Sequence, residues 1–310
     1  MVLLGLVVGA VSAEALLRVL FPNSMFSAGH RMTFTGQTAQ NFRLDAEVGF
    51  LPVLGTQFYS QYGCRPNDYD ALDPKGRQRL LFIGDSVTYR STIVDALQEL
   101  YGDQHYEYWN AGVESFNTTQ ELALYRRHNR SIHPHHVILT FHNNDYQETP
   151  AAIREGNRVS YYTPAGNRGR ISPWLMQHSY LYRFLLGISF GNSNHERRAR
   201  EVHEQLRAFH EELQQDKIQF SVLLLPIMRD PKDWSYRQRW SRDKALETFQ
   251  QLSLRHFDLL PPLTEGLQER LEVQEMPGDD WHPSRAISRK FANYLFQQRL
   301  LDLKKGAKHG

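Results

Sequence analysis

Cysteine is nearly absent from this chain of 310 residues, and neither sign of charge is in clear excess. The one cysteine, Cys64, excludes an intramolecular disulfide and any metal site built from several thiolates. Lys and Arg number 36 and Asp and Glu number 34, which gives a formal net charge of +2. Because the two signs are interspersed, the composition gives no reason to expect a nucleic-acid partner. No internal repeat is visible at the periods of solenoid proteins.

The N-terminus carries an apolar segment that is shorter than a typical membrane span. Met1 to Ala13 contains no charged residue, and the apolar pattern then continues past Glu14 and Arg18. A spanning helix needs about 20 apolar residues, and no Lys or Arg precedes this run. We expect residues 1–22 to be a signal peptide, cleaved near Val11-Ser12-Ala13, or a membrane anchor. Export or anchoring in the cell envelope is therefore predicted, with a core helix of a cytoplasmic protein as the alternative.

Short apolar runs alternate with helical patterns over most of the chain. The runs predicted to be strands are 80–83, 105–109, 136–141, 218–225 and 257–260. The helical patterns cover 91–101, 118–130, 196–216, 243–254 and 284–303. Strands that alternate with helices in this way predict a parallel sheet covered by helices on both faces.

Two segments lack this alternation. Residues 23–78 are rich in Gly, Pro, Asn, Gln and aromatics, so we expect extended, loop-rich structure there. Residues 146–194 interrupt the main pattern and contain a short helical pattern around 174–186. The predicted main domain therefore covers 79–303, with 146–194 as an insert and 304–310 as a tail.

Polar or small residues follow three of the predicted strands directly. Ser86, Gly112 and Asn144 each stand just after a strand ends. Ligands of open parallel sheets gather beyond the carboxyl ends of the strands. We therefore expect these three residues on one edge of the sheet, where the loop before the last helix can also place His282.

The residues at this edge suit nucleophilic catalysis by serine. Ser86 is a candidate nucleophile, His282 a base, and Asp279, three residues before it, an acid that can orient the imidazole. Asp280 competes with Asp279 for that role. The chain contains no Gly-x-Ser-x-Gly around Ser86, which argues against the nucleophile elbow of ordinary α/β-hydrolases.

Four short motifs, in this order, resemble those of the SGNH, or GDSL-like, hydrolase family. They are Gly84-Asp85-Ser86, Asn110-Ala111-Gly112, Asn144-Asp145 and Asp279-x-x-His282-Pro283. Each motif alone is weakly specific, whereas four in order are strongly so. The resemblance spans about residues 78–300 and implies a flavodoxin-like three-layer α/β/α sandwich with a central parallel sheet.

The resemblance also implies a role for each motif residue. Ser86 would attack an ester carbonyl, His282 would carry the proton, and Asp279 would hold the imidazole. The oxyanion would be bound by the backbone N–H groups of Ser86 and Gly112 and by the side-chain amide of Asn144. This chemistry needs no cofactor and no metal.

Two residues depart from the pattern of the family and make the expected pocket rim more polar. Arg90 stands where relatives often have a small residue, and Asn143 stands where many have glycine or an apolar residue. With Trp281, they are our candidates for substrate binding, and they favour a sugar-like substrate. Asp45–Phe50 and Gly63-Cys64-Arg65 further resemble the leader of exported bacterial members of the family.

Two other groups of residues leave alternatives open. Tyr161, Tyr162 and Trp174 of the insert can stack on sugar rings over the site or serve as ordinary packing aromatics. Four histidines, at 128, 133, 135 and 136, make a metal site conceivable. We do not expect one, because no carboxylate lies among them and two of them would face opposite sides of a strand.

The sequence thus predicts a serine esterase that acts on acyl esters, with O-acetyl groups of carbohydrate as its preferred substrate. An O-acyltransferase that modifies a cell-envelope polysaccharide would use the same residues. A glycan-binding envelope protein without activity is the third alternative. A carbohydrate or other small ester is the only partner that the sequence indicates, besides a possible membrane contact of the N-terminus.

Overall fold

The computed structural model contains two compact units, which are described one at a time. The N-terminal unit comprises Met1–Tyr59 and Tyr146–Glu201, and the sheet unit comprises Ser60–Asp145 and Val202–Gly310. The structure describes residues 2–20, 30–69, 71, 76–162, 172–189 and 195–301. The predicted tail at 304–310 lies outside the described residues.

The sheet unit is built on a five-stranded parallel sheet in the order β10-β9-β6-β4-β5. Its strands are β4 (Gln78–Gly84), β5 (Tyr106–Gly112), β6 (His136–Phe141), β9 (Gln219–Leu224) and β10 (His256–Asp258). The chain enters with β4, adds β5 on one side, and then adds the other three strands in turn on the other side. This is the strand order of flavodoxin-like folds, so the predicted fold class is confirmed.

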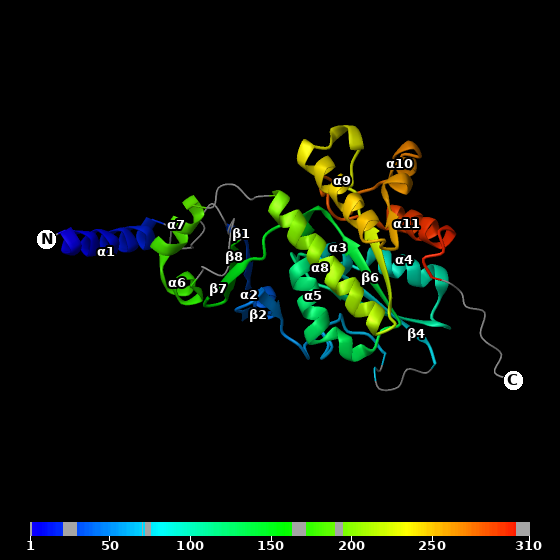
Figure 1. Cartoon of the computed structure of the whole chain (residues 1–310), viewed down its shortest axis with the longest axis horizontal. Helices are drawn as coiled ribbons and strands as arrows, with labels where there is room; N and C mark the ends of the chain where they lie inside the picture. Colours follow the sequence, from blue (N-terminus) through cyan, green and yellow to red (C-terminus); the bar gives the residue numbers. More distant parts are fainter. Residues whose placement is uncertain are drawn as a thin grey trace. The chain divides into compact units, whose positions relative to one another are not determined.

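Helices cover both faces of the sheet and complete three layers (Figure 1). Side chains of α4, α10 and α11 pack on one face, and side chains of α5, α8 and α9 lie on the other. The helices are α4 (Thr92–Tyr101), α5 (Thr118–Arg127), α8 (His195–Gln215), α9 (Tyr236–Gln251), α10 (Leu260–Gln268) and α11 (Arg285–Gln297). Single turns are formed by α3 (Ser86–Tyr89), η1 (Asn129–Ile132), η2 (Asn143–Tyr146) and η4 (Pro231–Asp233).

The strands contribute apolar side chains to two cores, one on each face of the sheet, because successive side chains of a strand point to opposite faces. On one face, Phe82 of β4 packs in a buried cluster with Leu97 of α4 and Phe291 of α11. On the other face, Phe141 of β6 meets Phe249 of α9 edge-on, with ring centroids 5.3 Å apart. Burial of each such side chain contributes about 1.5–3 kcal/mol, so both faces hold the helices in place.

The two largest differences from the predicted helix boundaries are at the start of one helix and at the end of the last. Helix α9 begins at Tyr236 instead of residue 243, because Ser235 and Gln238 form a capping box at its start. The last helix ends at Gln297 instead of residue 303. Arg299, with φ +56°, turns the chain into the left-handed conformation that commonly terminates helices.

The N-terminal unit joins the segment before the main domain to the predicted insert. A three-stranded antiparallel sheet has the order β1 (His30–Thr35), β8 (Arg158–Tyr162), β7 (Ala151–Glu155). A two-stranded sheet consists of β2 (Phe42–Asp45) and β3 (Gly49–Pro52), and α2 (Gly36–Gln40) precedes it. The sequence predicted extended structure in the first segment, but not its pairing with the insert.

Aromatic side chains form the core of this unit. The cluster contains Phe34, Phe42, Phe50, Tyr59 and Tyr161. Tyr161 is 6% exposed and therefore serves as a packing aromatic, which was one of the two alternatives. Trp174 is 66% exposed and stacks on His178, with ring centroids 5.0 Å apart. The side chain of Tyr162 lies outside what the structure describes.

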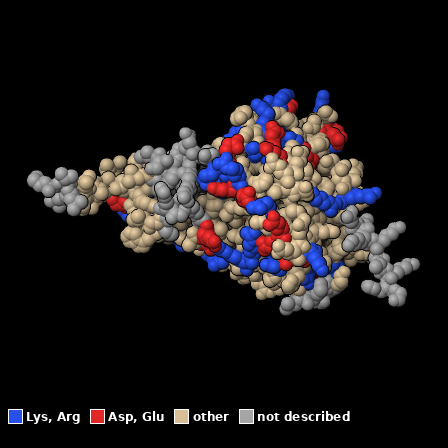
Figure 2. Space-filling model, in the orientation of Figure 1, with Lys and Arg blue, Asp and Glu red and all other residues tan. Residues whose placement is uncertain are grey.

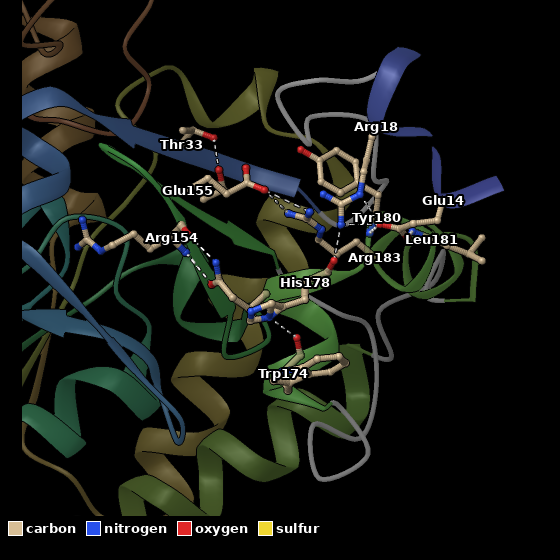
Figure 3. A network of polar contacts seen from close by, with 12 residues as sticks. Glu14, Arg18, Thr33, Arg154, Glu155, Trp174, His178, Tyr180, Leu181 and Arg183 are labelled. Carbon is tan, nitrogen blue, oxygen red and sulfur yellow. Dashed lines mark hydrogen bonds and ion pairs between the residues drawn. The ribbon is translucent and has the colours of Figure 1, made fainter. Parts of the chain in front are cut away.

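The N-terminal helix α1 (Val2–Leu20) is docked by polar contacts on α7 (Tyr180–Ser189), which follows α6 (Pro173–His178). Figure 3 shows Glu14 at the start of α7, where its carboxylate accepts hydrogen bonds from the backbone N–H groups of Tyr180 (3.0 Å) and Leu181 (2.8 Å). Burial by itself would raise the pKa of Glu14, but these hydrogen bonds outweigh it and lower the pKa to about 2. Arg18 lies 4.7 Å over the ring of Tyr180.

The predicted cleavage site at residues 11–13 lies inside α1. Helix α1 exposes large apolar side chains along its length: Leu6, Val7, Val8, Val11, Leu16, Val19 and Leu20. Across the described ranges, no helix combines the length and the apolar character that crossing a membrane requires.

Candidate active site

Ser86 lies in a tight turn between the central strand and a short helix. Strand β4 ends at Gly84, Asp85 is the N-cap of α3, and Ser86 is the first residue of that helix. The Asp85 carboxylate accepts a hydrogen bond from the backbone N–H of Val87 (2.8 Å). Position 84 needs glycine, because a Cβ atom there would lie 2.2 Å from Oγ1 of Thr88. The turn thus places Ser86 at the carboxyl edge of the sheet, as the sequence predicted.

A chain of hydrogen bonds connects Ser86 to His282 and Asp279. Nε2 of His282 lies 2.9 Å from Oγ of Ser86, and Nδ1 lies 2.7 Å from Oδ2 of Asp279. The other oxygen of Asp279, Oδ1, accepts hydrogen bonds from the backbone N–H groups of Trp281 (3.1 Å) and His282 (3.2 Å). Burial would raise the pKa of Asp279, but the hydrogen bonds from His282 and Trp281 lower it below its ordinary value. Asp279 is therefore a carboxylate aimed at the imidazole.

The neighbouring Asp280 points elsewhere and holds the loop. Its Oδ1 accepts a hydrogen bond from Nε2 of Gln274 (2.9 Å), and its Oδ2 pairs with Nη1 of Arg229 (3.0 Å). Its backbone carbonyl accepts the N–H of Met228 (2.8 Å). Of the two aspartates that compete for His282 in the sequence, Asp279 is the one in contact with it.

Gly112 lies beside the nucleophile turn, but its backbone N–H is already engaged. Gly112 pairs with Gly84 across β5 and β4, and its N–H donates to Oδ1 of Asn110 (2.9 Å). A Cβ atom at position 112 would lie 2.2 Å from the backbone nitrogen of Tyr89 in α3. The structure thus gives Gly112 a packing role that the sequence analysis did not anticipate. Its predicted role as an oxyanion donor requires its N–H to leave Asn110.

The amide of Asn144 is likewise held by its surroundings. Its Nδ2 donates to Oδ2 of Asp85 (2.7 Å) and, over a longer distance, to the carbonyl of Phe116 (3.3 Å). The Asp85 carboxylate fixes the orientation of the amide, because a flipped amide would bring two acceptor oxygens together. As the first residue of α3, Ser86 has a backbone N–H without an intrahelical acceptor. Asp85 thus joins Asn144, which belongs to η2, to the turn that carries Ser86.

Buried carboxyl groups lie beneath this turn, a feature that sequence reasoning missed. Asp145 accepts hydrogen bonds from the backbone N–H of His142 (2.6 Å) and from Thr118 (2.8 Å). Burial raises the pKa of Glu121 well above its ordinary value, and the carboxylates of Asp145 and Asp85 raise it further. Burial also raises the pKa of Asp145, to about 7. Because Asp145 has two donors of its own, Glu121 is the group that keeps a proton.

The three predicted substrate-binding residues have different surroundings. The guanidinium of Arg90 pairs with the carboxylate of Glu275, and its Nη1 lies 3.8 Å from Oδ2 of Asp279. Trp281 is 37% exposed and contacts the buried ring of His142 edge-on, at 5.0 Å between centroids. Asn143 begins η2 and is partly exposed. Arg90 thus faces carboxylates of the chain, which the sequence prediction did not include.

These carboxylates also bear on metal binding. Glu275, Asp279 and His282 each place one potential ligand atom within 4.8 Å of the others, and no other such group occurs in the part of the chain that the structure describes. The guanidinium of Arg90 already contacts both carboxylates and supplies the positive charge there. A metal ion at this point would have to displace Arg90.

Two of the four clustered histidines have partners on neighbouring strands. Nδ1 of His135 accepts the backbone N–H of Arg79 (3.0 Å), and Nε2 of His136 lies 2.9 Å from Oγ of Ser221. Burial lowers the pKa of His136 to about 3, so its imidazole is neutral. Both histidines therefore take part in the packing at the start of β6.

Of the comparisons with known proteins, only the one with solved structures finds similar proteins. No family model matches the chain, and no curated protein matches it. The acetylxylan esterase Axe2 from Geobacillus stearothermophilus is 15% identical over 71% of this chain and 93% of its own, with a TM-score of 0.47. The acetyl xylan esterase AlAXEase is 14% identical over 71% and 98% of the two chains, with a TM-score of 0.46.

A third similar structure is LAE5, an alpha/beta hydrolase enzyme from the metagenome of Lake Arreo. It is 14% identical over 71% of this chain and 94% of its own, with a TM-score of 0.48. At this level of similarity, the activities of these proteins do not transfer to the chain. Any statement about its chemistry depends on the residues of the candidate active site.

Proposed function

We propose that the chain is a serine esterase that hydrolyses acyl esters, with O-acetyl groups on carbohydrate as its substrate class. The observation that carries this proposal is the continuous hydrogen-bond chain from Ser86 through His282 to Asp279, with lengths of 2.9 Å and 2.7 Å. A serine, an imidazole and a partly buried carboxylate in this order make the constellation of acyl-transfer enzymes.

The reaction follows from the positions of these atoms. Oγ of Ser86 attacks the ester carbonyl and loses its proton to Nε2 of His282. The tetrahedral intermediate collapses as the C–O bond to the alcohol breaks, and His282 returns the proton to the leaving oxygen. Water then attacks the acyl-enzyme with His282 again as the base, which releases the acid and restores Ser86. Throughout, Asp279 keeps Nδ1 of His282 protonated and thus leaves Nε2 free to accept.

The negative oxygen of the intermediate needs donors near Ser86. The backbone N–H of Ser86 is one, because it has no intrahelical acceptor. The amide of Asn144 is the second, and it can serve by exchanging its longer bond to Phe116 for the oxyanion while its bond to Asp85 persists. Gly112 is the third donor implied by the sequence, provided that Asn110 releases its N–H. Each such donor contributes about 10²–10³-fold to turnover.

The charge of the surface suits a neutral substrate. On the face shown in Figure 2, Lys and Arg are interspersed with Asp and Glu, so that face has no extended area of one sign. Such a surface does not attract polyanions such as nucleic acids. Export or anchoring through the apolar N-terminus would bring the enzyme to acetylated carbohydrate at the cell envelope.

The decisive experiment is hydrolysis of p-nitrophenyl acetate, butyrate and octanoate, and of acetylated xylo-oligosaccharides, by wild type and Ser86→Ala. We expect turnover that favours acetate and that Ser86→Ala abolishes without unfolding the protein. Ser131→Ala, which changes an exposed serine in η1, is the matched control and should retain full activity.

Three results would count against this proposal. Full activity of Ser86→Ala would refute the mechanism. Acetyl transfer to an oligosaccharide in preference to acetate release would identify an acyltransferase. A folded protein with no turnover and no labelling of Ser86 by a fluorophosphonate probe would indicate a binding protein.

A further inference from the structure

Arg90 connects the nucleophile turn to the loop that carries the base. Its backbone follows α3 directly, and its N–H donates to the carbonyl of Ser86 (3.0 Å). Its side chain leaves this turn and reaches the loop between α10 and α11, where it pairs with Glu275. The two residues are 185 positions apart in the sequence, so this ion pair joins distant parts of the chain.

Glu275 and His282 face each other on that loop. The backbone N–H of Glu275 donates to the carbonyl of His282 (2.9 Å), and Gln274 pairs with Pro283 in an antiparallel bridge. The loop is therefore a closed hairpin with Glu275 on one arm and His282 on the other. Any displacement of Glu275 moves His282 as well.

Two carboxylates lie near the imidazole of His282, and a cation between them is favourable. His282 lies against Asp279, with Glu275 close by on the same hairpin. Arg90 is the cation in contact with both carboxylates, with Nη1 3.8 Å from Oδ2 of Asp279. Without Arg90, the two negative carboxylates would remain together on the hairpin and repel each other.

We propose that Arg90 is a positioning residue, which holds the hairpin of Asp279 and His282 against the nucleophile turn through its ion pair with Glu275. This inference rests on the proposed esterase mechanism and replaces substrate binding as the role of Arg90. The side chains of Arg90 and Glu275 are 30% and 33% exposed, and ion pairs at such exposure add little to stability. Their effect on geometry is larger, because misplacement of a catalytic group by about 1 Å can cost about 10²-fold in rate.

The test is a double-mutant cycle with separate measurement of kcat and KM. The variants are Arg90→Gln, Arg90→Lys, Glu275→Gln and the Arg90→Gln/Glu275→Gln double mutant, assayed on p-nitrophenyl acetate. Arg289→Gln is the matched control, because Arg289 forms an ion pair of 3.1 Å with Glu99 on the surface between α11 and α4. A thermal melt of each variant shows whether it folds.

We expect Arg90→Gln to lower kcat by about 10- to 100-fold with KM nearly unchanged and with little change in melting temperature. Arg90→Lys should recover part of the loss, since lysine restores the charge but not the fork of the guanidinium. The double mutant should be no worse than Arg90→Gln, because both changes break one interaction. Arg289→Gln should behave as wild type.

Other outcomes would overturn the proposal. A higher KM with unchanged kcat would return Arg90 to substrate binding. Additive losses in the double mutant would show that Arg90 and Glu275 act separately, and equal kcat in Arg90→Gln and Arg289→Gln would show that Arg90 has no role. If wild type hydrolyses no ester, the esterase proposal fails, and the rate at which a fluorophosphonate labels Ser86 replaces kcat in the same cycle. Equal labelling of wild type and Arg90→Gln, or no labelling of either, would then refute the positioning role.

Discussion

Asp279→Asn changes one oxygen to an NH₂ group at the point where the hydrogen-bond chain ends. Two backbone N–H groups, from Trp281 and His282, point at Oδ1 of Asp279. The amide oxygen of asparagine will stay with these donors, so its NH₂ group will face Nδ1 of His282. Nδ1 must then accept a hydrogen bond from this NH₂ group, so the ring proton of His282 moves to Nε2. In this tautomer the imidazole cannot take the proton of Ser86.

The size of the effect follows from this change of tautomer. In a serine protease triad, an equivalent replacement of the aspartate lowers kcat by about 10⁴-fold. At about 1.36 kcal/mol for each factor of ten, the barrier rises by about 5.5 kcal/mol. We expect a loss of this order here, because Asp279 is the carboxylate in contact with His282 at 2.7 Å.

The adjacent aspartate provides a matched control for this experiment. Asp280→Asn makes the same chemical change one residue away, in an ion pair with Arg229 whose side chains are 34% and 29% exposed. Such a pair is worth about 0–1 kcal/mol, so we expect less than about a tenfold change in kcat. The assay is p-nitrophenyl acetate hydrolysis, with thermal melts of both variants. The reasoning is refuted if Asp279→Asn keeps more than a tenth of wild-type kcat, or if Asp280→Asn loses as much.

Two further predictions concern residues that support the nucleophile turn. Gly112→Ala should lower both melting temperature and kcat, because the added Cβ would lie 2.2 Å from the backbone nitrogen of Tyr89 and push α3 off β5; unchanged kcat in a folded variant would contradict this packing role. Glu121→Gln removes a carboxyl group whose pKa burial has raised. An acid with a raised pKa stabilises the fold below its ordinary pKa and loses that contribution as pH rises through the folded value. Urea unfolding between about pH 4 and pH 8 should therefore show a flatter decline in the free energy of unfolding for Glu121→Gln than for wild type; parallel curves would exclude a proton on Glu121.

The sequence predicted those features that depend on local pattern or on recognisable motifs. Apolar runs located the five strands of the sheet, and the residues after β4 and the motif near the C-terminus indicated that Ser86 and His282 meet across 196 positions. The Asp-x-x-His motif of the resembled family favoured Asp279 over Asp280, and Asp279 is the one in contact with His282. These predictions were correct because strand periodicity and the spacing of reactive groups can be recognised from residues that are close together in the sequence.

The features that the sequence did not predict depend on contacts between distant residues. Arg90 is predicted to contact substrate because it stands where relatives of the resembled family often have a small residue. Nothing near it in the sequence indicates its contact with Glu275, 185 positions away. Glu121 stands in a helical pattern as an ordinary polar residue, and only burial against Asp145 changes its chemistry. The start of α9 was missed because its first turns are charged and aromatic, although Ser235 and Gln238 mark the cap.

The pairing of β1 with β8 has a consequence for the order in which the protein can be made. Thr33 and Ser160 meet across 127 positions, so β1 leaves the ribosome long before its partner strand exists. At about 5–20 residues per second, that interval lasts roughly 6–25 seconds. During this time the segment that forms β1 has backbone N–H and C=O groups without a strand partner. These groups are available to a chaperone or to the same segment of another nascent chain.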